Sequence, residues 1–359
     1  MPTIVTSEHT GNALSFPPMG LFGSSKKVDE ALPEQPRILS LGNGVTVPLA
    51  PDDYPPILES LRTRSSIQPA PEFHADWMGV RTRIAMLPWA PQELVNTVSS
   101  ELPIPDDGYR SEAEEYVGLA LALKRAVDNF QIIEVGAGWA PWVVSGLVGA
   151  KERGLKARGI AVEAHPEHAR WAIQHAQDNG IDVDFLEGTD TEIIEALRQS
   201  TATMSVLLAA GWHENTVLEF PDVDGMDMGL AVCTMPDSGT DYRGAHLKHR
   251  EVTAIRLHDL FDALANPMID LLHIDVQGVE FELLNKEATT VQDHAKLMAV
   301  GTHSRLAEGQ LQDFYLERGW GIIIDEPCKA IFTMTHPTLA GFTVQDGFQL
   351  YENPFLLKN

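Results

Sequence analysis

Six residues that could bind a ligand or do chemistry follow short apolar runs of the sequence. They are Glu134, Gly136, Gly138, Glu163, Asp275 and His303. Carboxylates and imidazoles bind hydroxyl groups and cations, and they can accept a proton from a reacting group. If the apolar runs are parallel strands, their carboxyl ends meet at one edge of a sheet, which is where such sheets bind ligands. The pattern therefore predicts one site assembled from distant parts of the chain.

The first apolar run leads into a glycine loop at residues 134–141. Gly136 and Gly138 allow a sharp turn and a close approach of the backbone to a ligand, because a Cβ would block either position. A helix that begins at Pro141 directs its free N–H groups at the same place. The loop therefore predicts a bound ligand, and two classes of ligand are compatible with it.

A dinucleotide loop has the pattern G-x-G-x-x-G/A, with an acidic residue about 20 positions later. Here Pro141 takes the third place, and Glu163 lies 25 positions beyond Gly138. A loop for S-adenosylmethionine (SAM) has an acidic residue two positions before its first glycine. Glu134 has that position and can hold the amino-acid end of a cationic ligand. Glu163 can accept hydrogen bonds from both ribose hydroxyls of either ligand.

The composition predicts a folded, acidic protein. The chain has 359 residues, 44% of them hydrophobic, which is enough to bury a sizeable core. It carries 26 Lys and Arg against 51 Asp and Glu, a net charge of −25. This charge disfavours nucleic acid and anionic membranes as partners, because phosphate groups require a basic surface. It favours a protein that acts on neutral or cationic molecules.

The compartment is predicted from three features. The cysteines, Cys233 and Cys328, provide no disulfide framework. No stretch approaches the roughly 20 apolar residues of a membrane helix. The first residues have neither the basic nor the apolar segment of a secretory signal. We therefore expect a cytoplasmic protein with no membrane partner, and the sequence leaves its oligomeric state open.

The order of the elements predicts an α/β protein with a doubly wound, mostly parallel, Rossmann-like sheet. Residues 1–40 are expected to be a poorly ordered lead-in, and residues 41–105 a small N-terminal cap or lid with little regular structure. Residues 106–359 form the main domain, within which 187–265 is a variable insert of uncertain topology. Trp77 is placed in the lid, over the site.

Helices and strands alternate through the main domain. Ser111 and Glu114 predict a capping box before a helix whose apolar face extends to Val127. Further helices are expected over 141–153, 166–179 and the segment TEIIEALRQS. Strands are expected over 131–136, 159–163, 181–186, 269–278, 296–304 and 321–326. The segment MSVLLAAGWHENTVLEF and the residues flanking QDGF each predict an antiparallel hairpin, the latter at the C-terminus.

Several of these segments resemble a known family. The stretches EVGAGWAPW and GIAVEAHPEHARWAIQHAQDNGI resemble class I SAM-dependent methyltransferases. Within that class, IDLLHIDVQGVEFELL and MAVGTHSR resemble the FkbM family, whose signature is a D-V-x-G-x-E element and a later strand that ends near E-x-H. The resemblance covers about residues 110–325. The chain departs from the family at Ala140, where a third glycine is usual, and at Gly301, where Glu is frequent.

The resemblance implies SAM-dependent methylation of a hydroxyl oxygen, often on a sugar, a glycan or a hydroxylated natural product. It assigns cofactor binding to Glu134, Gly136, Ala137, Gly138, Glu163, Ala164 and Asp275. Glu134 and the glycines would line the methionine end of SAM, and Glu163 would hold the ribose. Asp275 would lie beside the sulfonium and the incoming acceptor.

An alcohol is a poor nucleophile until it loses its proton, so the site needs a base. His303 is the first choice, with Asp275 and Glu280 as the other catalytic candidates. These three side chains could also hold Mg²⁺ or Mn²⁺. Their spacing does not demand a metal, and we predict none. The pair His165 and His168 has zinc-like spacing, but it is predicted to be a solvated helix start.

Two other functions remain open at this stage. One is a nicotinamide-dependent (NAD) oxidoreductase on a Rossmann sheet, against which Pro141 and Glu134 count. The other is a non-catalytic SAM-binding partner subunit, which the departures at Ala140 and Gly301 keep open. The methyltransferase is the function we predict.

Overall fold

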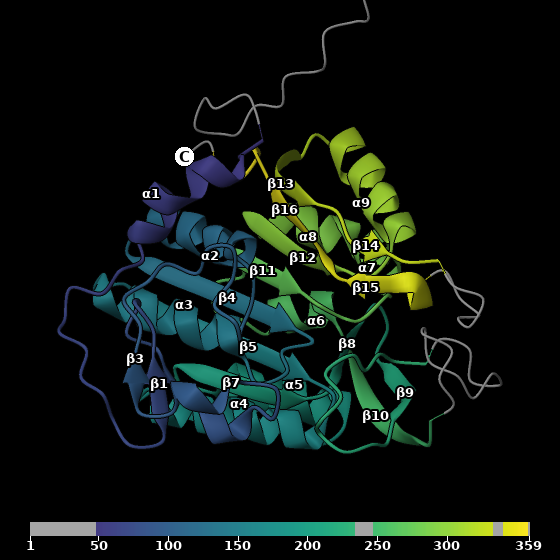
Figure 1. The fold of residues 1–359 in the computed structure, drawn as a ribbon. Coiled ribbons are helices and arrows are strands. Elements are labelled where there is room, and N and C mark those ends of the chain that lie inside the picture. Colours follow the sequence, from purple (N-terminus) through teal and green to yellow (C-terminus); the bar gives the residue numbers. More distant parts are fainter. Residues whose placement is uncertain (1–47, 234–246, 333–339, 358–359) are drawn as a thin grey trace, which may run out of the picture. The chain divides into compact units, whose positions relative to one another are not determined.

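The computed structural model describes residues 48–233, 247–332 and 340–357. Its centre is an eight-stranded sheet with the order β13-β16-β12-β11-β4-β5-β7-β6 (Figure 1). The strands are β4 (Asn129–Val135), β5 (Lys156–Glu163), β6 (Val183–Leu186), β7 (Met204–Leu208), β11 (Leu271–Ile274), β12 (Leu297–Thr302), β13 (Gly321–Glu326) and β16 (Gly347–Glu352). Only β16 runs antiparallel to its neighbours in this sheet. The mostly parallel α/β prediction is therefore confirmed.

Helices cover both faces of the sheet. One face packs against α2 (Ala113–Arg125), α3 (Pro141–Glu152) and α4 (Pro166–Asp178). The other packs against α5 (Asp190–Gln199), α6 (Leu257–Asp262), α7 (Glu280–Lys286), α8 (Ala288–His294) and α9 (Arg305–Glu317). Because side chains alternate along a strand, Ile132 belongs to the first core and Ile133 to the second. The sheet is thus doubly wound.

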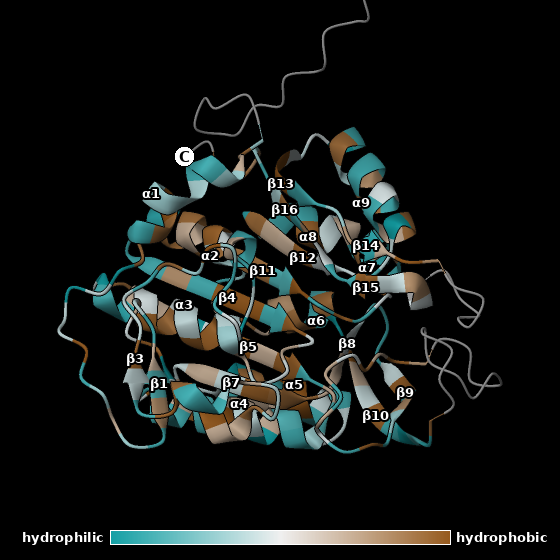
Figure 2. Ribbon diagram, viewed as in Figure 1, coloured by the Kyte–Doolittle hydropathy of each residue, from teal (hydrophilic) through white to brown (hydrophobic). Residues whose placement is uncertain are grey.

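The hydropathy pattern follows from this burial. Figure 2 shows that the central strands are largely hydrophobic, whereas the helices mix hydrophobic and hydrophilic residues. A strand covered on both faces has no side exposed to solvent, so its sequence is a nearly continuous run of apolar residues. No helix among the described residues is long and apolar enough to cross a membrane.

The segment before the main sheet has more regular structure than predicted. It contains α1 (Tyr54–Glu59) and a small sheet of β1 (Phe73–Ala75), β2 (Arg81–Arg83) and β3 (Thr97–Val98). Three single turns of 3₁₀ helix, η1 (Pro51–Asp53), η2 (Ile84–Met86) and η3 (Gln92–Leu94), complete it. Trp77 is fully buried and packs edge-on against Tyr116 of α2, so it is a core residue and no part of a lid. The predicted lead-in, residues 1–40, lies outside the described residues.

The capping-box prediction for α2 is wrong. The helix begins at Ala113, and its N-cap, Glu112, makes no side-chain capping bond. The Ser111 hydroxyl donates instead to Glu115. Val127 is also misplaced, since it lies beyond the end of the helix and is 76% exposed.

Both predicted hairpins are wrong in their pairing. In the middle segment, β7 joins the main sheet, while β8 (Ala210–Trp212) and β9 (Thr216–Pro221) flank β10 (His249–Arg256) in a separate sheet. Near the C-terminus, β15 (Thr343–Gln345) pairs with β14 (Lys329–Ala330), and η5 (Ala340–Phe342) precedes it. β16 leaves β15 and inserts between β12 and β13. The turn at Asp346 therefore carries the chain from one sheet to another.

Candidate active site

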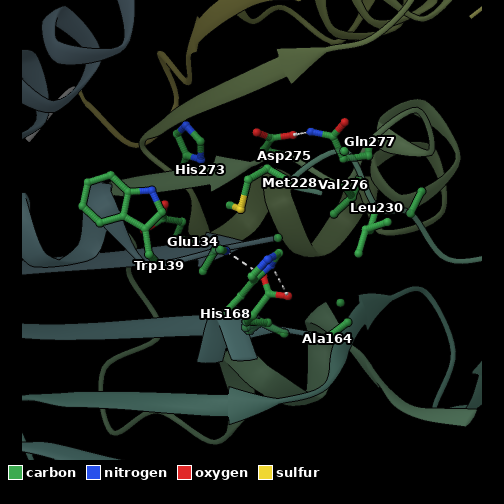
Figure 3. Close-up of a pocket in the computed structure, with 18 of the residues that line it drawn as sticks. Glu134, Trp139, Ala164, His168, Met228, Leu230, His273, Asp275, Val276 and Gln277 are labelled. Atoms are coloured by element: carbon green, nitrogen blue, oxygen red, sulfur yellow. Dashed lines mark hydrogen bonds and ion pairs between the residues drawn. The ribbon is translucent and has the colours of Figure 1, made fainter. Parts of the chain in front are cut away.

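A cavity of about 530 Å³ opens at the carboxyl ends of β4, β5 and β11. Figure 3 shows the strand-end residues Glu134, Ala164, His273 and Asp275 around it. Irregular segments complete its lining with Trp89, Tyr109 and Arg110, and with residue 226 and residues 228–232. The cavity brings together these predicted cofactor-binding residues: Glu134, Gly136, Ala137, Gly138, Glu163, Ala164 and Asp275.

The glycine loop has the backbone shape that its sequence requires. Gly136 has φ +75, and a Cβ there would lie 1.7 Å from the carbonyl oxygen of Asp275. Gly138 has φ +53, and its Cβ would meet the end of the Met228 side chain at 2.7 Å. Ala140 also adopts the left-handed conformation, with φ 55, directly before α3. Alanine therefore holds a conformation that glycine adopts more easily, which is the local cost of the departure from the family pattern.

Glu134 is buried beneath this loop and is tied to the start of α3. Its Oε2 accepts a hydrogen bond from the Val143 N–H at 2.8 Å, and its Oε1 accepts one from the Trp142 N–H at 3.5 Å. Burial raises the pKa of the Glu134 carboxyl to about 8, against the lowering effects of His273 and of the two N–H groups. A cation bound at this end of the cavity would favour the ionised form.

Glu163 links the end of β5 to the glycine loop. One of its oxygens accepts from the Gly138 N–H at 2.6 Å, and the other accepts from the His165 N–H at 2.6 Å. A carboxylate has about four lone-pair positions, so both oxygens retain capacity for ligand hydroxyls. The carboxylate is held rigidly by two backbone groups and faces the cavity.

Asp275 follows β11 and is the predicted catalytic carboxylate that the cavity exposes. Its side chain is 37% exposed, and the amide of Gln277 donates to its Oδ1 at 2.8 Å. Burial of the group raises the pKa of the Asp275 carboxyl to about 6, although His303 and His273 act in the opposite direction. Gly301 leaves room beside it, because a Cβ there would lie 3.3 Å from the Asp275 Cγ.

His303 and Glu280 lie behind Asp275, and neither lines the cavity. The His303 Nδ1 is 2.7 Å from Glu280 Oε1, and its Nε2 is 3.4 Å from Asp275 Oδ1 and 3.8 Å from Asp346 Oδ2. Burial lowers the pKa of His303, but Glu280 and then Asp275 and Asp346 raise it to about 10. The ring is therefore an imidazolium at neutral pH, among three carboxylates.

One ligand atom each from Asp275, Glu280 and His303 lies within 4.8 Å of the others. Oxygen and imidazole ligands at such spacing suit a divalent ion. In the structure, however, the His303–Glu280 hydrogen bond and the Gly278 N–H already use Glu280 Oε1. The prediction of no metal site stays a prediction.

Sequence reasoning missed several residues that line the cavity. His273 precedes Asp275 by two positions on β11, so both side chains face the same side, and its Nε2 is 2.7 Å from Glu115 Oε2. This period of two was available in the sequence. Asp346 was hidden because QDGF resembles a hairpin turn. No periodic signal marks the irregular segments that supply Trp89, Tyr109, Arg110, Met226, Met228, Leu230 and Val232.

The prediction of solvated histidines at the start of α4 is wrong. His165 and His168 are both buried, and each ring nitrogen Nε2 lies near a backbone carbonyl, of Val223 and Gly225 respectively. Zinc is not implied, since neither residue belongs to a group of three metal-binding side chains among those the structure describes.

Comparison with known proteins identifies the class. Residues 147–318 match the model of the methyltransferase FkbM domain. A curated protein of Jannaschia sp. (strain CCS1), with the provisional name methyltransferase, is 27% identical over 287 residues, which are 79% of this chain and 94% of that protein. Residues 147–318 are therefore similar to the FkbM methyltransferase domain, and the protein is a methyltransferase.

Solved methyltransferase structures also align with the chain. The crystal structure of Methyltransferase FkbM from Methylobacillus flagellatus KT aligns with a TM-score of 0.34 and 12% identity, covering 62% of this chain and 44% of that one. An rRNA methylase from Streptococcus thermophilus aligns with a TM-score of 0.35 and 7% identity, covering 66% and 95%.

Proposed function

We propose that the protein transfers a methyl group from SAM to a hydroxyl of a sugar, a glycan or a hydroxylated natural product. SAM supplies a methyl group that its sulfonium already activates. The protein then has to align the acceptor oxygen with that methyl group and remove the hydroxyl proton. The observation that carries this proposal is Asp275, a carboxylate exposed to the cavity at the end of β11 and backed by a buried histidine.

The residues of the cavity fit SAM. Gly136 lets the glycine loop lie directly against the backbone of Asp275, and the loop itself lines the cavity. Burial raises the pKa of the Glu134 carboxyl. The cationic methionine end of SAM would lower that pKa again and so favour the ionised form. Glu163 is held by two backbone N–H groups and retains acceptor capacity for ribose hydroxyls.

Asp275 is the base that we propose. Its pKa of about 6 leaves it ionised at neutral pH, close enough to neutrality for effective proton transfer. His303 cannot accept a proton while it is an imidazolium with a pKa of about 10. Its proposed role is therefore to position Asp275 and Asp346 and to balance their charge.

The acceptor that suits this cavity carries no phosphate or carboxylate. Glu115, Asp275 and Asp346 line one part of it and would repel an anion. Trp89 and Tyr109 also line the cavity, and aromatic side chains can cover the ring of a sugar or an aromatic aglycone. The net charge of −25 likewise disfavours RNA.

The test is methyl transfer from methyl-labelled SAM to a panel of defined acceptors. The panel pairs neutral sugars and hydroxylated aglycones with their phosphorylated or carboxylated counterparts, and it includes RNA and primary amines. We expect label in an ether of a neutral acceptor, and its loss in the Asp275→Asn variant. Label found only in RNA, only in an amine or only in an anionic acceptor would refute the proposal.

A further inference from the structure

The segment 222–232 has neither helix nor strand, and its second half, residue 226 and residues 228–232, lines the cofactor cavity. Hydrogen bonds hold its two ends: Asp222 N–H donates to the Lys248 carbonyl at 2.6 Å, and Cys233 N–H donates to the Glu219 carbonyl at 2.8 Å. Between these ends, the side chains of Met226, Met228, Leu230 and Val232 line the cavity. Met228 reaches the glycine loop, where its end would touch a Cβ on Gly138.

The first turn of α4 holds the middle of this segment. Gly225 is buried, so both of its backbone polar groups need partners. Glu167 Oε2 accepts from the Gly225 N–H at 2.9 Å, and His168 Nε2 lies 3.1 Å from the Gly225 carbonyl oxygen. One residue pair on α4 therefore satisfies the buried Gly225, which directly precedes Met226 of the cavity wall.

A second contact extends this attachment. His165 Nε2 lies 3.0 Å from the Val223 carbonyl oxygen, two residues before Gly225. His168 also faces Glu163, the carboxylate proposed to bind the ribose hydroxyls, since its Nδ1 is 3.8 Å from Glu163 Oε1. The segment is thus connected through α4 to the same carboxylate that holds the glycine loop.

We propose that His165, Glu167 and His168 are positioning residues that clamp the segment 222–232 over the cofactor, so that SAM affinity depends on them. The sequence H-P-E-H then has a function that requires no metal. Glu167 and His165 do not line the cavity, so they act on the cofactor through the segment. This inference rests on the proposed function, because it presumes that the cavity takes SAM.

The test is calorimetric titration of S-adenosylhomocysteine (SAH) into the full chain and its variants. Glu167→Ala removes the acceptor of the Gly225 N–H, and we expect SAH to bind about 5- to 50-fold more weakly, in the range that an unsatisfied buried donor costs. Glu167→Gln retains an acceptor oxygen and should restore most of the affinity. His165→Ala is a second variant on the same segment and should act in the same direction.

The matched control is Glu195→Ala on α5, where an exposed glutamate contacts only side chains of its own helix among the described residues, Arg198 and Gln199. It should leave SAH affinity unchanged. Amide hydrogen exchange should become faster over 222–232 in Glu167→Ala and His165→Ala, and unchanged in the control. If wild type binds SAH and both variants bind it equally well, the clamp is refuted. If wild type does not bind SAH, the proposed function itself fails.

Discussion

Two carboxylates stand at the ends of neighbouring strands, Glu134 on β4 and Asp275 after β11, and their surroundings differ. The strands pair in parallel, with Ile274 beside Val135. Glu134 is 2% exposed and bound to N–H groups at the start of α3. Asp275 has a side chain that is 37% exposed; its Oδ1 accepts a hydrogen bond from the Gln277 amide and lies 3.4 Å from His303 Nε2.

The difference suggests two roles: Glu134 holds the ligand, and Asp275 takes part in the reaction. A buried carboxyl fixed by backbone groups can orient a ligand, but it is not exposed to receive the proton of an acceptor hydroxyl. A carboxylate at the cavity surface, with a buried imidazolium behind it, can take one and return to its place. The predictions below test this division of roles.

The largest effect is expected from Gly136→Val. Its side chain would collide with the Asp275 carbonyl, where a Cβ alone would lie at 1.7 Å, so it disturbs both carboxylates at once. We expect loss of SAH binding together with a lowered melting temperature, whereas the sequence alone suggests loss of binding in a fully folded protein. Calorimetry and thermal unfolding measure the two effects.

The matched control is Gly154→Val. Gly154 has a similar φ of +71, but nothing lies within 4 Å of its Cβ. It should lower stability through backbone strain and leave SAH affinity unchanged. Equal SAH affinity in Gly136→Val and wild type would show that the loop is misassigned.

Asp275→Asn should have the next largest effect. Removing a general base slows transfer by about 10²- to 10⁴-fold, and SAH affinity should change far less. In wild type, transfer should rise with pH through about 6 as the Asp275 carboxyl loses its proton, and then level off. Steady-state rates across pH, with exposed Asp262→Asn as control, measure this. Near-normal turnover in Asp275→Asn would remove Asp275 from the chemistry.

The smallest effect concerns Glu134. Its carboxyl has a pKa of about 8 in the empty cavity, and a bound cation would lower that value. Binding of SAH should therefore release protons and become tighter as the pH rises toward 8. Titrations in two buffers of different ionisation enthalpy report the protons released. No release near neutral pH would mean that Glu134 does not contact the amino group.

The strand-end residues could be predicted from the sequence because the parallel sheet imposes a simple rule. Buried strands appear as apolar runs, and the polar residue at each carboxyl end lies at the ligand-binding edge. That rule found Glu134, Glu163 and Asp275. It did not predict that His303 would be buried behind Asp275. Nor did it predict the charge of His303, because three carboxylates that are distant from it in the chain raise its pKa.

The remaining walls could not be predicted, because they depend on long-range pairing. β10 separates β8 from β9, although the local sequence predicts a hairpin between them. Asp346 reaches the site because β16 inserts between β12 and β13. The segment 222–232 has no period of its own, so nothing in its sequence predicts that α4 would hold it.

The most direct test is titration of the wild-type protein with SAH and, separately, with NAD⁺. Glu134, the glycine loop and Glu163 predict micromolar binding of SAH and no binding of NAD⁺. Binding of NAD⁺ alone would contradict the cofactor assignment, and with it the roles proposed for Glu134 and Asp275.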